Sequence, residues 1–187
     1  CIIEIIKNEN LSKTQNVIIF FFWRISYNIG LGILLRSQSL YSTLTKWFIR
    51  HTDDKLNSKN KINFMYWIAS CGYPRKHSLN PRHYPASFNA WVIFKNLVTI
   101  ILVNDGLNYL LLAYQFFELP NEFTWFIILQ YLVGILLGVI CLATKNDALR
   151  CIGSYCWYYG DFFFRKKQSL TFDGIFELFP HPMYTVG

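Results

Sequence analysis

The sequence has few charged residues, and few acidic ones in particular. Charged side chains make up 16% of its 187 residues, and 11 acidic residues stand against 18 basic ones. Since a soluble domain usually carries about 25% charged residues, an ordinary soluble domain is not favoured. The 53% hydrophobic share excludes a disordered chain, because so much apolar surface has to be buried. The composition favours a chain that contacts lipid.

Cysteine is also scarce and irregularly placed. Five cysteines are an odd set in a chain too long for a small disulfide scaffold. No CxxC pair occurs: Cys151 and Cys156 are five residues apart, and Cys71 and Cys141 stand alone. We therefore expect no metal site and no disulfide framework. The sequence also has no internal repeat and no low-complexity tract.

Three apolar runs are long enough to cross a bilayer as helices, which takes about 20 mainly apolar residues. They cover residues 17–35, 88–117 and 123–143. A fourth patch, residues 62–69, is too short to cross and is expected at the membrane interface. The predicted fold class is therefore all-α: a polytopic integral membrane helical bundle. We expect it to be incomplete at both ends, as a single partial domain over residues 1–187.

Two of these runs contain ionisable groups. Arg24 is the one formal charge of the first run, and the second run holds Lys95 and Asp105. An ionisable group inside a span usually faces a partner or a cavity. We expect Asp105 to pair with Lys95 or Arg24. An alternative is a non-enzymatic membrane transporter or scaffold subunit, since Asp105 with the neighbouring Asn104 and Asn108 could instead mark a pathway.

The distribution of basic residues predicts the orientation. Residues 36–82 and 145–167 carry most of the lysines and arginines, whereas the turn at 118–122 carries none. Basic loops stay preferentially on the cytoplasmic side, so both basic segments are predicted to be cytoplasmic. The net charge of +7 thus belongs to loops between spans. It does not form the basic stripe with interleaved aromatics that nucleic-acid binding requires, so no nucleic-acid partner is expected.

The last residues of the chain form the most informative stretch, His181-Pro-Met-Tyr184-Thr-Val-Gly187. Proline suits the first turn of a helix, so Pro182 would place His181 at a helix mouth, where unpaired backbone N–H groups attract a carboxylate or phosphate. Tyr184 would lie one turn further in, and Gly187 would allow a close approach. The alternative is a loop-to-helix turn at the interface with Tyr184 as an anchor.

Two segments carry a family resemblance. Residues 153–164, GSYCWYYGDFFF, and residues 170–187, LTFDGIFELFPHPMYTVG, resemble the fungal phosphatidylethanolamine N-methyltransferases, as does WRISYNIGLGILLRSQS at residues 23–39. The resemblance implies an integral endoplasmic-reticulum enzyme that methylates the headgroup amine of the membrane lipid phosphatidylethanolamine. This is the first step toward phosphatidylcholine, with S-adenosylmethionine as methyl donor. His-Pro-x-Tyr is also similar to isoprenylcysteine carboxyl methyltransferases, which remain an alternative.

The same resemblance implies the site, within a cofactor-binding segment at residues 151–187. S-adenosylmethionine would be held by His181, Pro182, Tyr184 and Gly187, with Gly160 forming another wall. The family pattern Tyr-x-Gly is one residue longer here, and Pro180 stands where relatives often have arginine. A basic partner for the cofactor carboxylate would then come from residues 165–167. The segment is expected to face the cytoplasm, and the 187-residue chain is expected to be inactive alone.

The catalytic group is not identified by the sequence. Asp161 and Glu177 are candidates for the base that takes a proton from the amine. The competing interpretations are a cap or headgroup-level acid for Asp161, and a solvated helix face shared with Asp173 for Glu177. Glu177 could also bind the lipid ammonium. The oligomeric state is left open.

Overall fold

The computed structural model describes residues 13–72, 80–117, 120, 122, 124–164 and 173–178. All regular elements within these ranges are helices. The chain divides into two compact units. The first comprises residues 1–117 with 162–164, and the second comprises residues 118–161 with 165–187.

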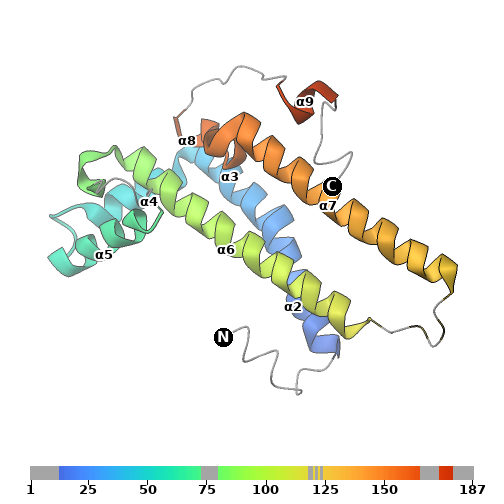
Figure 1. Ribbon diagram of the computed structural model, residues 1–187. Coiled ribbons are helices and arrows are strands. Elements are labelled where there is room, and N and C mark those ends of the chain that lie inside the picture. The colour runs from blue at the N-terminus through green and yellow to red at the C-terminus, as the bar shows by residue number, and fades with distance from the viewer. Residues whose placement is uncertain are drawn as a thin grey trace. The chain divides into compact units, whose positions relative to one another are not determined.

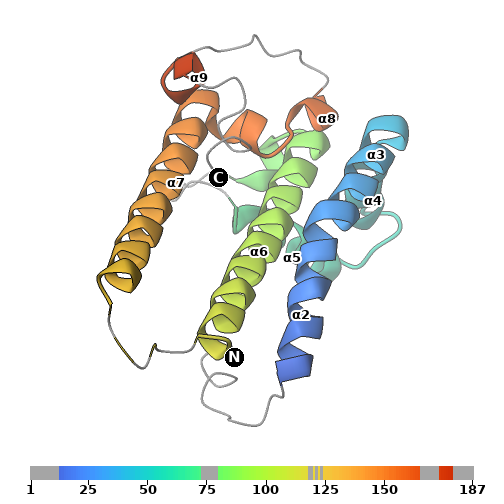
Figure 2. The same ribbon diagram turned by 90° about the vertical axis from the view of Figure 1, so that its right-hand side faces the viewer.

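The first unit is built on a long helical hairpin (Figures 1 and 2). One arm is continuous from α2 (Lys13–Ile25) through the π-helix η1 (Ser26–Gly30) to α3 (Leu31–Tyr41), and the other arm is α6 (Ala86–Gln115). The two arms run antiparallel, because Asn16 near the start of α2 donates a hydrogen bond of 2.9 Å to Oε1 of Gln115 at the end of α6. Both arms are long and apolar enough to cross a membrane.

The π-helix coincides with two polar side chains that bond to the preceding turn. Ser26 Oγ donates to the carbonyl of Phe22 at 2.7 Å, and Asn28 Nδ2 donates to the carbonyl of Arg24 at 2.9 Å. Such side-chain bonds to backbone carbonyls compete with the regular helical ladder. The first apolar run therefore lies within one continuous helical segment of 29 residues, Lys13–Tyr41, which has a locally altered turn in its middle.

Short helices cover one end of the hairpin, where α3 ends and α6 begins (Figure 1). They are α4 (Thr43–Thr52), α5 (Lys59–Ser70) and the 3-10 helix η2 (Pro81–His83). Their core is apolar and centres on Phe48 of α4 and Phe94 of α6, each 1% exposed, with Ile62, Met65 and Ala69 of α5 also buried. The patch at residues 62–69 thus lies in a helix of 12 residues, which is too short to span a bilayer.

The second unit is dominated by α7 (Trp125–Trp157), a helix of 33 residues, followed by α9 (Ile175–Leu178). The short helix α8 (Asp161–Phe164) starts in this unit, and its last three residues belong to the first. None of the most apolar 18-residue window of α7 is buried. A long helix that is apolar all round and uncovered by protein suits a lipid environment.

The predicted fold class is confirmed: the described chain is all-helical, with three helices able to cross a membrane at residues 13–41, 86–115 and 125–164. The first and third of these helices extend beyond the C-terminal ends of their apolar runs. In particular, α7 continues through the basic stretch after residue 143 and ends at Trp157, so the cofactor-binding segment predicted at 151–187 starts inside a helix. Helical hydrogen bonds do not stop where the hydrophobic stretch stops.

Candidate active site

The C-terminal end of α7 is bent at one glycine. Gly153 has φ 69° and ψ 171° inside the helix, a backbone region that is essentially restricted to glycine. The last turn, Ser154–Trp157, is therefore offset from the rest of α7. Glycine at this position decides the direction in which the aromatic stretch that follows leaves the membrane helix.

The aromatic stretch then ends the helix in a Schellman motif. The N–H of Gly160 donates to the carbonyl of Tyr155 at 2.8 Å, and the N–H of Tyr159 donates to the carbonyl of Cys156 at 3.0 Å. This pair of bonds satisfies carbonyls that the end of a helix leaves free. The motif needs a left-handed residue, which here is Tyr159 with φ 56°. Tyrosine is unusual in that conformation, so the surrounding contacts hold the turn in place.

The ring of Tyr155 packs directly against Gly160. A Cβ atom on Gly160 would lie 2.4 Å from Cε2 of Tyr155, which is far inside van der Waals contact. Only glycine fits beneath this ring. Gly160 is predicted as a wall of the cofactor site. In this structure its N–H donates to the carbonyl of Tyr155, and the ring of Tyr155 fills the space next to its Cα.

Asp161 follows at the first position of α8 and is exposed. Its carboxylate lies close enough to act electrostatically on the hydroxyl of Tyr155 and the thiol of Cys156. The Schellman turn therefore places a solvent-accessible carboxylate beside a group of aromatic rings. A carboxylate in this position can accept a proton or pair with a cation.

A second carboxylate fixes the position of α9. Oδ2 of Asp147 accepts a hydrogen bond of 2.9 Å from the backbone N–H of Ile175, and Oδ1 pairs with Nη2 of Arg150 at 3.2 Å. Asp147 thus joins the middle of α7 to the first residue of α9, the helix that carries Glu177. The sequence reasoning missed Asp147. The acid-to-arginine spacing of three residues on one helix was the available signal, but it pointed only to a local ion pair.

Only some of the predicted site residues lie within the described part of the chain. Glu177 is exposed on α9 and Asp161 is exposed on α8; within the described residues, the two make no hydrogen bond or ion pair with each other. The residues predicted to hold the cofactor or its carboxylate lie outside the described residues, namely His181, Pro182, Tyr184, Gly187, Arg165, Lys166 and Lys167. Their roles stay predictions.

The partner of Asp105 is Arg24. Nε of Arg24 lies 3.2 Å from Oδ1 of Asp105, and the two side chains are 40% and 10% exposed. The contact is an ion pair without hydrogen-bond geometry. The guanidinium also lies 5.3 Å from the centre of the Phe20 ring, a cation–π distance. The prediction that Asp105 pairs with Lys95 or Arg24 is confirmed for Arg24, and the pair joins the two arms of the hairpin.

Comparison with known proteins gives a family match at the end of the chain and relatives along its whole length. The family model described as phospholipid methyltransferase matches residues 129–187. A protein of Yarrowia lipolytica named phosphatidylethanolamine N-methyltransferase is 37% identical over 90% of this chain. Proteins of the same name from Candida tropicalis and Pyricularia oryzae are 35% identical over all of it and 39% identical over 96% of it.

The chain is thus similar, over at least 90% of its length, to three fungal proteins named phosphatidylethanolamine N-methyltransferase. It spans 18 to 22% of the length of these three relatives. No solved structure matches the chain. The phospholipid methyltransferase match begins within α7 and includes Asp147, Gly153, Gly160, Asp161 and Glu177. All the features described above for the end of α7 therefore lie within the residues that the family model matches.

Proposed function

We propose that this chain is part of a membrane enzyme that transfers a methyl group from S-adenosylmethionine to the amine of phosphatidylethanolamine, the first step toward phosphatidylcholine. The observation that carries the proposal is the coincidence of two findings. The phospholipid methyltransferase match covers residues 129–187, and fungal relatives with that activity in their name align with at least 90% of the chain.

The residues at the end of α7 fit a cationic cofactor by their chemistry. S-adenosylmethionine, when bound, supplies an electrophilic methyl group on a positively charged sulfur. Trp157, Tyr158 and Tyr159 offer aromatic faces, which attract cations, and Asp161 adds a carboxylate at the same turn. His181, Pro182, Tyr184 and Gly187 would hold the cofactor, and Gly160 would support it indirectly by seating Tyr155 in the turn.

The proposed reaction also requires a group that accepts a proton from the headgroup ammonium. A primary ammonium has a reference pKa of about 10.4, taking lysine as the model, so the headgroup nitrogen is protonated at neutral pH and has no free electron pair. It must lose that proton before its electron pair can form the new N–C bond. Asp161 and Glu177 are the proposed acceptors, and a positioned base typically contributes 10²–10⁴-fold to the rate.

The proposed setting is the endoplasmic-reticulum membrane, with the site on the cytoplasmic face. Three helices can cross a bilayer, and the basic segments between them support a cytoplasmic position for the end of α7. The pairing of Asp105 with Arg24 gives that carboxylate a structural role, so it no longer favours a transport pathway. The oligomeric state is not part of the proposal.

The test uses the full-length parent protein in microsomes, with labelled S-adenosylmethionine and phosphatidylethanolamine. The double variant His181→Ala with Tyr184→Phe should lose methyl transfer, and unchanged activity would overturn the assignment of the cofactor site. A prenylated cysteine acceptor, assayed beside the phospholipid, separates the isoprenylcysteine alternative. Preference for that acceptor would contradict the proposed substrate.

The catalytic carboxylates need a matched comparison. Asp161→Asn and Glu177→Gln each remove one negative charge with little change of shape, and Asp173→Asn does the same on an exposed neighbour of α9. If Asp161 or Glu177 is the base, its variant should lower kcat at neutral pH by about 10²-fold or more, with recovery at higher pH as more amine is unprotonated. An effect no larger than that of Asp173→Asn would exclude the residue.

A further inference from the structure

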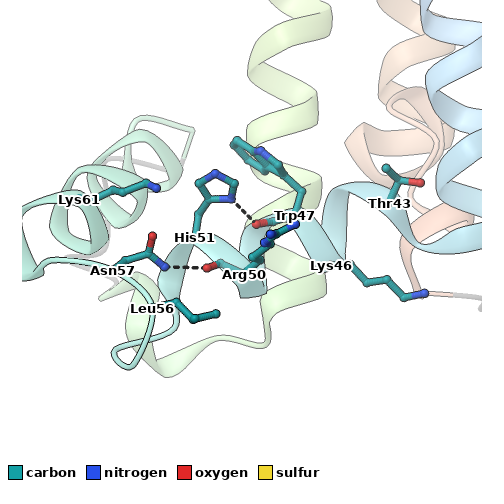
Figure 3. A pocket seen from close by; sticks show the side chains of 8 residues that line it. All are labelled: Thr43, Lys46, Trp47, Arg50, His51, Leu56, Asn57 and Lys61. Carbon is teal, nitrogen blue, oxygen red and sulfur yellow. Dashed lines mark hydrogen bonds between the residues drawn. The ribbon is translucent and has the colours of Figure 1, made fainter.

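A basic pocket lies in the first unit, between α4 and the start of α5. Its volume is about 570 Å³, and it is lined by Thr43, Lys46, Trp47, Arg50, His51, Leu56, Asn57 and Lys61 (Figure 3). The lining includes three permanent cations and no carboxylate. Neither the family match at residues 129–187 nor the proposed methyl transfer assigns a role to these residues.

The helix that forms one wall is held firmly. The buried side chain of Gln38, 2% exposed, accepts hydrogen bonds from the backbone N–H groups of Leu44 and Thr45 at 2.8 and 3.4 Å. Gln38 therefore caps the first turn of α4, which otherwise has free donors. On the opposite side of α4, Phe48 is buried at 1% exposure. These contacts fix the orientation of α4, so that its other face lines the pocket.

The loop between α4 and α5 is tied to the same helix. Asn57 Nδ2 donates to the carbonyl of Arg50 at 2.7 Å. This bond joins two residues that line the pocket. In Figure 3 the amine of Lys61 extends from α5 toward the ring of His51 on α4, while Lys46 extends away along α4. Lys61 and His51 therefore face each other, and Arg50 also lines the pocket.

These cationic groups are available to a ligand. Within the described residues, Lys46, Arg50 and Lys61 form no ion pair with a carboxylate. His51 contacts the carbonyl of Trp47 through Nδ1 at 2.8 Å. Since a carbonyl only accepts hydrogen bonds, Nδ1 carries the proton and Nε2 is left for another partner. A neighbouring hollow, lined by Lys59 and Arg82, differs because Asp54 lies in its wall.

The position of the pocket points to the membrane surface. It lies at the end of the hairpin where α3 ends and α6 begins (Figure 1), beyond two helices long enough to span a bilayer. Trp47 is 40% exposed and Leu56 is 67% exposed, so apolar side chains stand beside the cations. This combination suits a lipid headgroup with part of its glycerol region better than a free ion.

We propose that this pocket binds the phosphate of an anionic phospholipid headgroup through Arg50 and Lys61, with Trp47 and Leu56 against the glycerol region. The charge selects against a zwitterionic lipid, because the three cations repel the ammonium of an ethanolamine or choline headgroup. The pocket is therefore a binding site for a lipid other than the proposed methyl acceptor.

The experiment measures binding to the full-length parent protein in nonionic detergent by microscale thermophoresis. The probes are dioctanoyl phosphatidic acid, dioctanoyl phosphatidylcholine and inorganic phosphate. We expect saturable binding of phosphatidic acid that weakens as salt is raised, with at least tenfold weaker binding of phosphatidylcholine. Equal affinity for inorganic phosphate would overturn the lipid as ligand, and equal affinity for phosphatidylcholine would overturn selection by charge.

The matched variants carry equal changes of charge. Arg50→Gln with Lys61→Gln should weaken phosphatidic acid binding by roughly tenfold or more, since each basic group near an anionic lipid contributes to binding. Arg36→Gln with Lys55→Gln removes two exposed cations outside the pocket and should leave binding within about twofold. Equal losses in both pairs would show a diffuse charge effect and overturn the proposal. If the first pair fails to fold, Lys61→Gln alone, an exposed side chain, makes the same comparison with Lys55→Gln.

Discussion

Arg24 and Asp105 form an ion pair of 3.2 Å between α2 and α6, 81 residues apart along the chain. The pair is unequal in exposure: the carboxylate is 10% exposed and the guanidinium 40%. A charge that loses its partner costs more when it is more deeply buried. The two single substitutions should therefore differ.

Arg24→Gln leaves the buried carboxylate of Asp105 without its cationic partner. We expect it to reduce the free energy of unfolding by about 3 kcal/mol, at the lower end of the range for a broken buried pair. Asp105→Asn should cost less, because the guanidinium keeps its cation–π contact with the Phe20 ring. The double variant should recover part of the loss. Thermal unfolding in detergent gives the order, with the exposed Arg36→Gln as control. The reverse order of the single variants would contradict this account.

Asp147→Ala should release α9 from α7. It removes the acceptor for the N–H of Ile175, and loss of a helix cap costs about 0.5–2 kcal/mol. Hydrogen exchange should speed up at residues 173–178. Asp147→Asn retains an acceptor oxygen and should exchange more slowly than the alanine variant.

The control for Asp147 is Arg150→Gln, which removes only the ion pair with an arginine side chain that is 83% exposed. Exposed pairs contribute about 0–1 kcal/mol, so exchange at residues 173–178 should change little. If Arg150→Gln had the same effect as Asp147→Ala, the ion pair rather than the cap would hold α9.

Gly153→Ala should destabilise the end of α7 by about 1–3 kcal/mol, because alanine does not adopt the φ 69°, ψ 171° conformation without strain. Gly138→Ala is the matched control in the same helix, where an added Cβ meets nothing within 4 Å. It should be neutral or stabilising by about 0.5–1 kcal/mol. Thermal unfolding of the two variants measures the contrast, and similar values for both would show that the bend at Gly153 is not required.

Gly160→Ala should displace the ring of Tyr155 and, through the turn, Asp161. A misplacement of about 1 Å near a reacting centre costs on the order of 10²-fold in rate, so methyl transfer by the full-length protein should fall strongly. Tyr155→Leu in the same chain should restore much of the activity, because the smaller side chain leaves room for the new methyl. If the double variant stays as inactive as Gly160→Ala, Gly160 contacts the cofactor directly.

The sequence was sufficient to predict the three helices that are long and apolar enough to cross a membrane. Runs of apolar residues at 17–35, 88–117 and 123–143 leave few alternatives in lipid, since backbone polar groups there must be satisfied within the segment. The ends of the helices were less predictable. Polar and basic residues after position 143 continue α7 to Trp157, because helix propensity and local hydrogen bonds extend past the apolar stretch.

Around the candidate site, too, the sequence predicted some features and the structure alone showed others. The motif from Gly153 to Asp161 was visible in the sequence, but the reason for its glycines was not. The sequence predicts Gly160 as a cofactor contact, which stays a prediction, and the structure adds that the ring of Tyr155 packs against it. Nothing in the sequence predicted the hydrogen bond between Asp147 and Ile175, 28 residues away. A contact over such a distance depends on the path of the chain between the two residues.

The amino-acid sequence alone thus determined the all-helical fold with helices able to span a membrane, and the similarity to phospholipid methyltransferases, because hydrophobic length and motif spacing are local properties. Only the tertiary structure decided that Arg24 rather than Lys95 meets Asp105, that Asp147 holds α9, and that α4 and α5 enclose a pocket lined by Lys46, Arg50 and Lys61. These are relations between distant segments, and they are fixed by which faces of the helices pack together.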